Sequence, residues 1–341
     1  MQSLKPYLLD FICAALITAF SLPFLRKLTA KYLKDKPTEI KTHKGVISTA
    51  GGTALALGFF SALAAVRFTT DFPSGTLRNL RGIFIGGAII YLLGLIDDIK
   101  KPLGLSPYIR LVIQALAAAA LIYYGISVQF TAQPLGYVLT VLWVVGVTNA
   151  FNLIDIMDGL AVSQALLAAL AFTVISLPSE YIYVNFAACA LLGAAAAFWP
   201  YNHSKRLKTF LGDSGSTLLG FLLAALSLGT SYSAQNPLAV YAPLLILAVP
   251  VFNTGFVSVI RISKGINPLS ATPDHFPLRL KSVGLSGETI LLISAGAALL
   301  LDAAALYITK SGTQISLTIY AAAALMLTGA AIFLARIKNA S

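Results

Sequence analysis

Carboxylates, carboxamides and lysines gather in four short segments of a 341-residue chain that is 57% hydrophobic and only 11% charged. Soluble domains carry about 25% charged residues, so each polar cluster contrasts with its apolar surroundings. The segments cover residues 94–110, 149–159, 210–220 and 267–286. Their side chains are of the kinds that bind phosphate groups and hard divalent cations.

The first segment places Asp97 beside Asp98 and follows them with Lys100, Lys101 and Arg110. Adjacent carboxylates repel each other and shift each other's pKa unless a cation neutralises them. An anionic substrate held beside a metal ion fits this mixture of charges. The alternative is a solvated polar turn, which Pro102, Gly104 and Pro107 also suit.

The second segment carries Asn149, Asn152, Asp155 and Asp158 at a spacing of three after an apolar run. On an α-helix a step of three residues turns back by about 60°, so the four side chains cover about half of the helix surface. An elongated polar ligand suits that width better than a single metal ion does. Capping of the next helix is the alternative, and it accounts for Asp155 or Asp158 but not for all four.

The third segment, 210-FLGDSGSTLLG-220, sets Asp213 among glycines that allow close approach of the backbone. Its GDSG motif is also typical of serine proteases, but no His/Asp pair accompanies it and an apolar stretch follows. At a helix start, Asp213 would favour a phosphate together with a divalent cation. A plain N-cap is the alternative.

The fourth segment holds His275 between Asp274 and Arg279, with Lys281 close behind. A lone histidine is most often a loop residue whose hydrogen bonds are satisfied within the protein. Contact with a phosphate is the competing interpretation, because two cations lie next to it in the sequence.

Apolar stretches long enough to cross a hydrocarbon core of about 30 Å position these segments. We expect an all-α polytopic membrane protein with ten or eleven transmembrane helices, forming a single transmembrane domain over residues 1–341. The expected spans lie near residues 7–25, 49–66, 80–96, 107–124, 135–151, 160–177, 183–199, 214–231, 239–260, 289–308 and 316–335.

The charged residues orient these spans. When the loops alternate between the two sides, 19 of the 24 lysines and arginines fall on one face. By the positive-inside rule that face is cytoplasmic, so we expect the N-terminus outside and the C-terminus in the cytoplasm. The membrane is expected to be the plasma membrane. Carboxylates near a bilayer are costly and tend to face a cavity, a metal or a partner, so we expect the active site on this face. Six of the thirteen acidic residues lie in clusters at the span ends on this face: Asp97, Asp98, Asp155, Asp158, Asp213 and Asp274.

Composition also excludes several classes of function. A nucleic-acid role is not expected, because the net charge of +11 has no soluble basic fold to present it. Cys13 and Cys189 both fall inside expected spans, so neither a disulfide framework nor a thiolate metal site is supported. The three histidines are too scattered for a zinc site.

Taken in order, the motifs DD, NxxNxxD and GDxGS make the chain resemble the polyprenyl-phosphate N-acetylhexosamine-1-phosphate transferases over residues 40–285. The resemblance implies transfer of a sugar 1-phosphate, by default GlcNAc-1-phosphate, from a UDP-N-acetylhexosamine to a polyprenyl phosphate such as undecaprenyl phosphate, with release of UMP. It also implies Mg²⁺, with Mn²⁺ as the alternative, and a place at the first membrane step of a cell-envelope glycan pathway.

The same resemblance implies the roles of the catalytic residues. Asp213 would bind the metal ion, with Asn152 as a second ligand or a contact to the diphosphate. Asp97 and Asp98 would form the aspartate pair near the lipid phosphate. We expect these two aspartates to position groups beside the metal at least as much as to act as a general base, since a phosphate monoester is mostly ionised at neutral pH.

The nucleotide and the remaining substrate contacts are implied in the same way. Phe210 would stack on the uracil ring, Asp158 would read its edge, and Asp155 would support the nucleotide site. The other residues expected at the substrates are Asn149, Arg110, Lys100, Lys101, His275, Arg279 and Lys44.

The chain departs from the family pattern at three places. Ile156 replaces the first glycine of the usual Asp-Gly-x-Asp-Gly. The loop around His275 keeps one histidine where the main branches of the family have a cluster, which argues against a pentapeptide-bearing substrate. Lys44 opens KGVISTAGG instead of the usual Pro-then-Gly-Gly pattern.

Two other classes of protein compete with the enzyme. A secondary transporter of an anionic solute with a charged cytoplasmic gate would place acids near span centres and show an internal repeat, and the sequence has neither. A ligand-binding family member without catalytic activity is the third interpretation, because of the reduced histidine loop. The sequence leaves open the N-acetylhexosamine, the length of the polyprenol, the polymer and the oligomeric state, a homodimer included.

Overall fold

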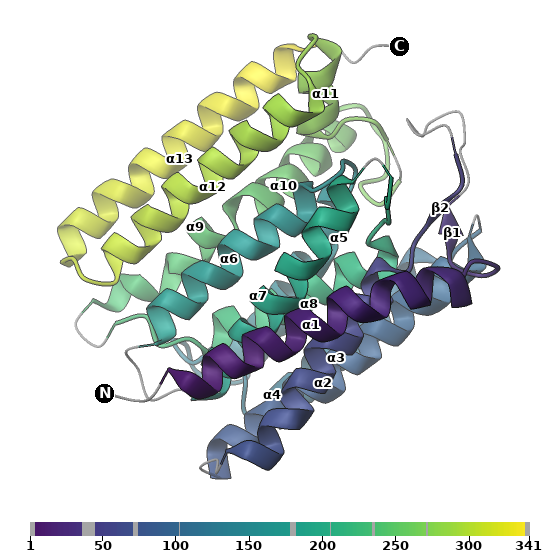
Figure 1. Cartoon of the computed structure of the whole chain (residues 1–341). Coiled ribbons are helices and arrows are strands. Elements are labelled where there is room, and N and C mark those ends of the chain that lie inside the picture. The colour runs from purple at the N-terminus through teal and green to yellow at the C-terminus, as the bar shows by residue number, and fades with distance from the viewer. Residues whose placement is uncertain are drawn as a thin grey trace.

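The computed structural model describes residues 4–35, 45–70, 74–101, 103–177, 182–204, 206–233, 236–270 and 272–337. In these ranges the chain forms helices joined by short loops, together with one two-stranded antiparallel sheet (Figure 1). The elements, in chain order, are α1 (Lys5–Leu28), β1 (Lys34–Asp35), β2 (Ile47–Ser48), α2 (Gly51–Thr69), α3 (Ser74–Lys100), α4 (Pro107–Tyr123), α5 (Leu135–Ile154), α6 (Leu160–Ser176), α7 (Ile182–His203), α8 (Gly212–Gly229), the 3₁₀ helix η1 (Pro237–Tyr241), α9 (Ala242–Ile246), α10 (Ala248–Ser263), α11 (Phe276–Ser282), α12 (Gly287–Ile308) and α13 (Thr313–Arg336).

The membrane-spanning character predicted from the sequence is confirmed. Seven of the described helices are long and apolar enough to cross a bilayer, namely α1, α2, α3, α5, α7, α12 and α13. The shorter apolar helices α4 and α6 and the buried helix α8 occupy three further expected spans. The expected span near 239–260 is broken, because η1–α9 and α10 bend by 70°. Pro250 in the first turn of α10 has no N–H to donate to the carbonyl of Ile246, which favours a break there.

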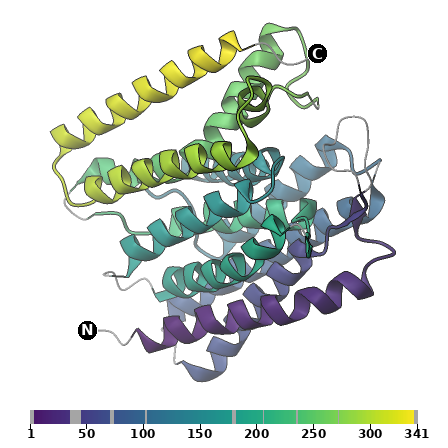
Figure 2. The same cartoon turned by 45° about the horizontal axis from the view of Figure 1, so that its top comes forward.

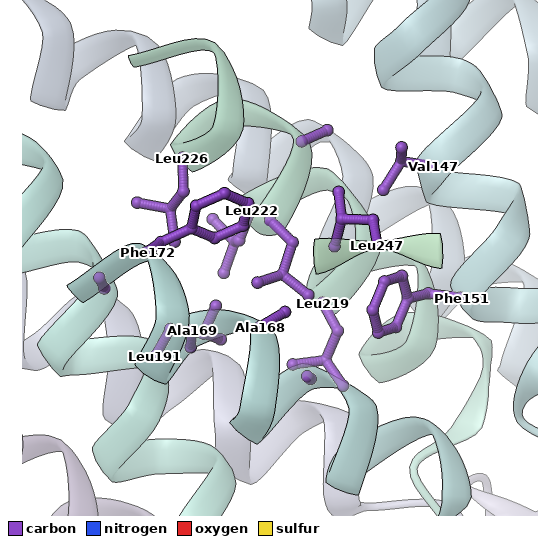
Figure 3. Close-up of a cluster of buried hydrophobic side chains, with 14 of the residues drawn as sticks. Val147, Phe151, Ala168, Ala169, Phe172, Leu191, Leu219, Leu222, Leu226 and Leu247 are labelled. Carbon is purple, nitrogen blue, oxygen red and sulfur yellow. The ribbon is translucent and has the colours of Figure 1, made fainter. Parts of the chain in front are cut away.

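Helix α8 forms the centre of the bundle, and every residue from Ser214 to Ser227 is buried. Figure 3 shows its leucines Leu219, Leu222 and Leu226 beside Phe151 of α5 and Phe172 of α6. In a bilayer, helices associate through van der Waals packing and small residues at the contact. Gly220 is such a contact, since a Cβ there would lie 2.7 Å from the Cα of Thr148 on α5.

The first turn of α8 is enclosed by glycines of two other helices. A Cβ on Gly94 of α3 would lie 2.4 Å from the Cα of Ser214, and a Cβ on Gly52 of α2 would lie 2.3 Å from the backbone nitrogen of Gly215. Neither distance is compatible with a side chain. Backbone contact therefore sets how α2, α3 and α8 meet at the end of the bundle that carries the acidic residues.

The small sheet fixes the segment that enters α8. Ser48 of β2 forms an isolated parallel bridge with Thr209, and the N–H of Phe210 donates to the carbonyl of Ser48 at 2.8 Å. The carbonyl of Phe210 in turn accepts from the N–H of Gly51 at 3.1 Å. The backbone of Phe210 is thus held on both sides by the chain between β2 and α2.

Helices α12 and α13 form an outer layer at one edge of the molecule (Figures 1 and 2). Large apolar side chains of α13 are exposed, for example Leu325 at 74% and Phe333 at 60%. A helix surface of this kind is stable in lipid, where no hydrophobic penalty applies, and its backbone hydrogen bonds are satisfied internally. The exposed surface of α13 therefore faces the bilayer.

Candidate active site

Asp98, near the end of α3, caps the start of α8. Its carboxylate accepts from the N–H groups of Asp213 and Ser214, each at 2.9 Å, and from the Ser214 hydroxyl at 2.7 Å. The first N–H groups of a helix have no partner within the helix, so a carboxylate at this place satisfies them and interacts favourably with the helix dipole. Asp98 is 1% exposed, and its hydrogen bonds identify it as the residue that positions Asp213.

Gly212 makes this arrangement possible. Its φ of +74° lies in the left-handed region, which favours glycine. A Cβ at this residue would lie only 2.6 Å from Oδ2 of Asp98. The glycine that precedes Asp213 in the motif therefore serves both the turn into α8 and the approach of the capping carboxylate.

Asp97 points to a different partner, although it is adjacent in sequence. Its Oδ1 accepts from the N–H of Leu105, and its Oδ2 lies 3.2 Å from Nη1 of Arg110. Gly104, with φ of +61°, lets the loop pass against this carboxylate, because a Cβ there would lie 2.9 Å from Oδ1. Asp97 therefore fixes the turn between α3 and α4, and Arg110 on α4 neutralises it.

Lys101 forms ion pairs with both Asp98 and Asp213. Its ammonium donates to Oδ1 of Asp98 at 2.8 Å and lies 3.2 Å from Oδ2 of Asp213. Burial acts against the charged form, but the carboxylates of Asp213 and Asp98 outweigh it and raise the pKa of Lys101 above its usual range. This ammonium is a permanent cation at neutral pH and is the counterion of both aspartates. Lys100, in contrast, is exposed at the end of α3.

Asn152, on the last turn of α5, completes the surroundings of Asp213. Its amide nitrogen donates to Oδ1 of Asp213 and to the hydroxyl of Ser216, each at 3.0 Å. The Asp213 side chain keeps 24% of its surface exposed, so it is the carboxylate of this network that a ligand can reach. Sequence reasoning placed Asn152 and Asp213 together, and the structure has them in contact.

The side-chain oxygen atoms of Asp213 and Asn152 are suitable ligands for a hard divalent cation. No group of three or more His, Cys, Asp or Glu side chains that could hold a metal ion occurs among the described residues. Mg²⁺ does not need such a cage, because it is commonly bound by one or two carboxylates and completes its shell with water and substrate phosphates. Asp213 supplies one partly exposed carboxylate, and rotation of the Asn152 amide would present its oxygen beside it.

Asp155 directly follows α5, between Asn152 and Asp158 in the sequence. Burial raises the pKa of Asp155 to about 7, and the charge of Asp213 adds to that increase. This carboxyl therefore changes its charge near neutral pH. Ile156 follows without backbone strain, since no non-glycine residue has a positive φ in the described part of the chain.

Asp158 and Phe210 come together through Lys208, a residue that the sequence analysis did not single out. The Lys208 ammonium lies 2.5 Å from Oδ2 of Asp158 and 5.5 Å from the centre of the Phe210 ring. A cation over an aromatic face is attracted by the ring's quadrupole. Only its position two residues before Phe210 could have indicated Lys208, and that spacing has no meaning without the loop geometry.

Asn149 lies one turn deeper in the membrane domain than Asn152. Its amide donates to Oε1 of Gln114 on α4 at 2.6 Å and to the carbonyl of Val145 at 2.8 Å. Gln114 is fully buried. Asn149 thus joins α4 to α5 in this structure, and its contact with a substrate stays a prediction. Lys44 lies outside the described residues.

His275 and Arg279 belong to a separate buried network at the same end of the bundle. Arg279 pairs with Asp274 at 2.9 Å and donates to the carbonyls of Leu334 and Ile337 at 3.1 and 2.7 Å. Asp274 also binds Lys264 at 2.7 Å. Arg279 therefore ties α11 to the end of α13, and its predicted phosphate contact stays a prediction.

The titration of this second network follows from its contacts. Burial would raise the pKa of Asp274, but hydrogen bonds from Lys264, Thr272 and Arg279 hold it at about 2. Burial, with Arg261 as the second cause, lowers the pKa of His275 to about 4. Its Nδ1 lies 3.1 Å from the amide nitrogen of Asn253, whose oxygen accepts from the N–H of Phe276 at 3.3 Å. His275 is therefore neutral, with its proton on Nε2.

Comparison with known proteins supports the identity that the motifs indicate. A family model described as glycosyl transferase family 4 matches residues 80–231, the part of the chain that contains most of α3, all of α4 to α8 and most of the candidate site. A probable undecaprenyl-phosphate N-acetylglucosaminyl 1-phosphate transferase of Bacillus subtilis is 30% identical over 296 residues, which cover 83% of this chain and 79% of that protein.

Relatives from other bacteria are similar over the same extent. The undecaprenyl-phosphate alpha-N-acetylglucosaminyl 1-phosphate transferase of Escherichia coli is 28% identical over 85% of this chain and 81% of its own length. The decaprenyl-phosphate N-acetylglucosaminephosphotransferase of Mycolicibacterium smegmatis is 29% identical over 83% of this chain and 77% of its own length. The match over most of both chains agrees with the ordered acidic motifs and the helical membrane fold: the chain is a membrane-embedded enzyme of glycosyl transferase family 4 that transfers a phosphosugar.

Proposed function

We propose that the protein transfers N-acetylglucosamine 1-phosphate from UDP-N-acetylglucosamine to a polyprenyl phosphate, giving a lipid diphosphate sugar and UMP. The relatives named above carry this activity in their names, with undecaprenyl or decaprenyl phosphate as the lipid. The observation that carries the proposal is the capped start of α8, where Asp98, Lys101 and Asn152 all contact Asp213 or its backbone.

The reaction exchanges one phosphorus–oxygen bond for another. An oxygen of the lipid phosphate attacks the β-phosphorus of the nucleotide sugar, and the bond from that phosphorus to the bridging oxygen breaks. UMP leaves with the bridging oxygen. A phosphate monoester has its second pKa near 6, so at neutral pH the lipid phosphate is mostly ionised and the total charge on both sides is equal. A general base is therefore not required.

The chain's own residues bring the anionic partners together. Asp213 and Asn152 would hold Mg²⁺, which when bound offsets the charge of the diphosphate and improves UMP as a leaving group. Lys101 and Arg110 supply positive charge beside the aspartates, and Lys100 adds an exposed positive charge at the surface. Positioning and charge stabilisation of this kind provide most of the catalysis in phosphoryl transfer.

The nucleotide end of the donor fits the cluster of Asp158, Lys208 and Phe210. Phe210 offers a ring face at the end of the bundle, and its backbone is held by Ser48 and Gly51. A uracil ring stacked there would have Asp158 within the same cluster to accept from its N–H, while Lys208 would exchange its contact with the ring for one with the ligand. His275 would contact phosphate through its neutral Nε2–H group.

We place this site on the cytoplasmic side of the plasma membrane, with the N-terminus outside and the C-terminus inside. The excess of lysine and arginine on the site's face supports this orientation. A UDP-sugar is charged and water-soluble and does not cross a bilayer unaided. The donor must therefore arrive from the cytoplasm.

The test is release of UMP by the purified protein in detergent, with polyprenyl phosphate, Mg²⁺ or Mn²⁺, and a panel of UDP-sugars. We expect turnover with UDP-N-acetylglucosamine, its loss when EDTA is added, and its loss in Asp213→Ala. Turnover restricted to another UDP-N-acetylhexosamine would correct the donor. No turnover with any donor, together with uptake of an anionic solute into liposomes, would favour a transporter instead.

A further inference from the structure

Asn202, in the last turn of α7, connects two loops that are far apart in sequence. Its Oδ1 accepts from the N–H of Gly159 at 2.6 Å, and its Nδ2 donates to the carbonyl of Thr209 at 3.1 Å. Asn202 is 3% exposed and so lies beneath the surface formed by these loops. A carboxamide can make both contacts because it carries one acceptor and two donors.

The two loops carry the two halves of the proposed nucleotide cluster. Asp158 directly precedes Gly159, and Phe210 directly follows Thr209. At the surface, Lys208 joins the same two loops through Asp158 and the Phe210 ring. Asn202 is thus the buried connection between Asp158 and Phe210, and Lys208 is the exposed one.

The connection matters most for the Asp158 side. The N–H of Thr209 also donates to the carbonyl of Tyr201 at 3.2 Å. The segment that bears Phe210 is therefore held to α7 by a second hydrogen bond. Gly159, with φ of +76°, stands at the N-cap of α6, where its N–H cannot find an acceptor within the helix. Removing the Asn202 side chain would leave this buried N–H unsatisfied, and the loop that bears Asp158 would move.

We propose that Asn202 is a positioning residue that sets the spacing between Asp158 and Phe210 and thereby the affinity for the nucleotide part of the donor. This inference rests on the proposed function, since it takes the nucleoside diphosphate as the ligand of that cluster. Asn202 need not touch the ligand. Its effect is therefore specific to the donor and should not extend to the lipid phosphate, for which Asp97 and Arg110 are the proposed neighbours.

The experiment compares Asn202→Ala with Asn236→Ala in the full-length protein in detergent. Asn236 is also buried, at 2% exposure, and its amide donates to the carbonyl of Ile308 at 3.0 Å and to the Ser316 hydroxyl at 2.8 Å. It joins α12 to α13, so its loss reproduces the removal of a buried amide away from the cluster. We measure the Kd for UDP by calorimetry, and the KM for each substrate and kcat by UMP release.

We expect Asn202→Ala to raise the Kd for UDP and the KM for the UDP-sugar about tenfold, the size of effect that loss of a buried hydrogen-bond partner produces. The KM for polyprenyl phosphate should stay within about twofold and kcat should fall by less than about threefold, which is the pattern of lost ground-state binding. Asn236→Ala should leave both KM values unchanged.

A second variant keeps the test decisive if the alanine protein is too unstable to assay. Asn202→Asp keeps the acceptor for Gly159 but replaces the donor to Thr209 by an oxygen that repels that carbonyl, so its donor KM should also rise while the KM for polyprenyl phosphate stays within about twofold. The proposal is overturned if the donor KM of Asn202→Ala or Asn202→Asp equals the wild-type value, or if both substrates' KM values rise equally. Failure of the wild-type protein itself to bind UDP would instead contradict the proposed function.

Discussion

Two networks of acids and bases at the same end of the bundle are built from similar residues and differ in what they leave open. Around the start of α8, Lys101 pairs with Asp98 and Asp213, and the Asp213 side chain keeps 24% of its surface exposed. Around α11, Arg279 and Lys264 pair with Asp274, whose side chain is only 2% exposed.

In the network around α11, the hydrogen-bond donors of Arg279 bind acceptors within the protein itself. Arg279 donates to the carbonyls of Leu334 and Ile337 as well as to Asp274, and it lies 5.3 Å from the centre of the Phe256 ring. The first network instead directs a carboxylate and an ammonium toward a surface a ligand can reach. The comparison teaches that charge and spacing identify both networks. Only the exposure of the carboxylate distinguishes a site that can bind a ligand from a network that stabilises the fold. The four predictions below test this distinction.

The largest effect should come from Asp213. We expect Asp213→Asn to lower the rate of UMP release by about a thousandfold or more, because it removes the exposed carboxylate proposed to hold the metal. The cap on α8 uses the backbone of Asp213 and not its side chain, so the protein should still fold. Activity assays together with thermal unfolding would check both parts. A variant that keeps more than a tenth of the wild-type rate would show that another group holds the cation.

Asp98→Asn should have the next largest effect, about a hundredfold on activity. Its new amide can accept only one of the N–H groups of Asp213 and Ser214, so the start of α8 would lose part of its cap. Because Asp98 acts by position, activity should be equally low at pH 7 and pH 9. Recovery of most of the activity at pH 9 would show that Asp98 is a general base and would contradict its assignment as a cap.

Arg279→Ala should change stability more than catalysis. Removing the guanidinium leaves Asp274 buried with one fewer partner and two carbonyls at the end of α13 unsatisfied, a loss of about 3 kcal/mol. The donor KM and kcat of the protein that remains folded should stay within about threefold of the wild type. Urea unfolding and kinetics at low temperature would separate the two. A large rise in KM with unchanged stability would place Arg279 at a substrate after all.

The smallest effect concerns pH. A histidine in the unfolded chain takes up a proton near pH 6.5, whereas His275 in the native protein does so only near pH 4. The unfolded state therefore binds more protons across this window, and stability is lost as the pH falls from about 6.5 to about 4, by on the order of 2 kcal/mol. The loss from Asp274 follows at lower pH, because its native pKa is about 2.

His275→Asn should flatten the fall in Tm between pH 6.5 and pH 4, since it keeps a polar side chain and removes the titrating group. The difference in Tm between the two proteins should therefore shift in favour of the variant as the pH falls through this window. A slope that is unchanged in the variant would mean that other groups cause the acid sensitivity.

The sequence predicted the helical membrane fold well, because hydropathy depends on local composition. Helices occupy all eleven stretches expected as spans, but only seven of the described helices, or eight with the bent pair, are long and apolar enough to cross a bilayer. The 70° break at the ninth stretch was missed, since a bent helix pair is as apolar as a straight one. The pairing of Asn152 with Asp213 was expected from the resemblance to the transferase family. In contrast, the capping role of Asp98 depends on how closely Gly94 and Gly52 allow three backbones to approach, and no spacing in the sequence records that distance.

The polar series of the second segment shows the same limit. Its period of three suggests one shared ligand, yet Asn149 turns to Gln114 while Asn152 turns to Asp213. Each step of 60° around the helix brings the side chain to a different neighbour. Lys208 and Asn202 were missed for the opposite reason, because their neighbours in space come from segments with no regular spacing to them.

The position of Lys101 has a consequence for how ligands enter. Asp97 is neutralised by Arg110, so the remaining aspartates of the α8 site, Asp98 and Asp213, share the single ammonium of Lys101 and have a net charge of about −1. The protein therefore carries its own counterion where charge must be exchanged. A divalent cation that arrives at Asp213 would displace the Lys101 ammonium from that carboxylate, and Lys101 could then pair with a phosphate of the incoming diphosphate.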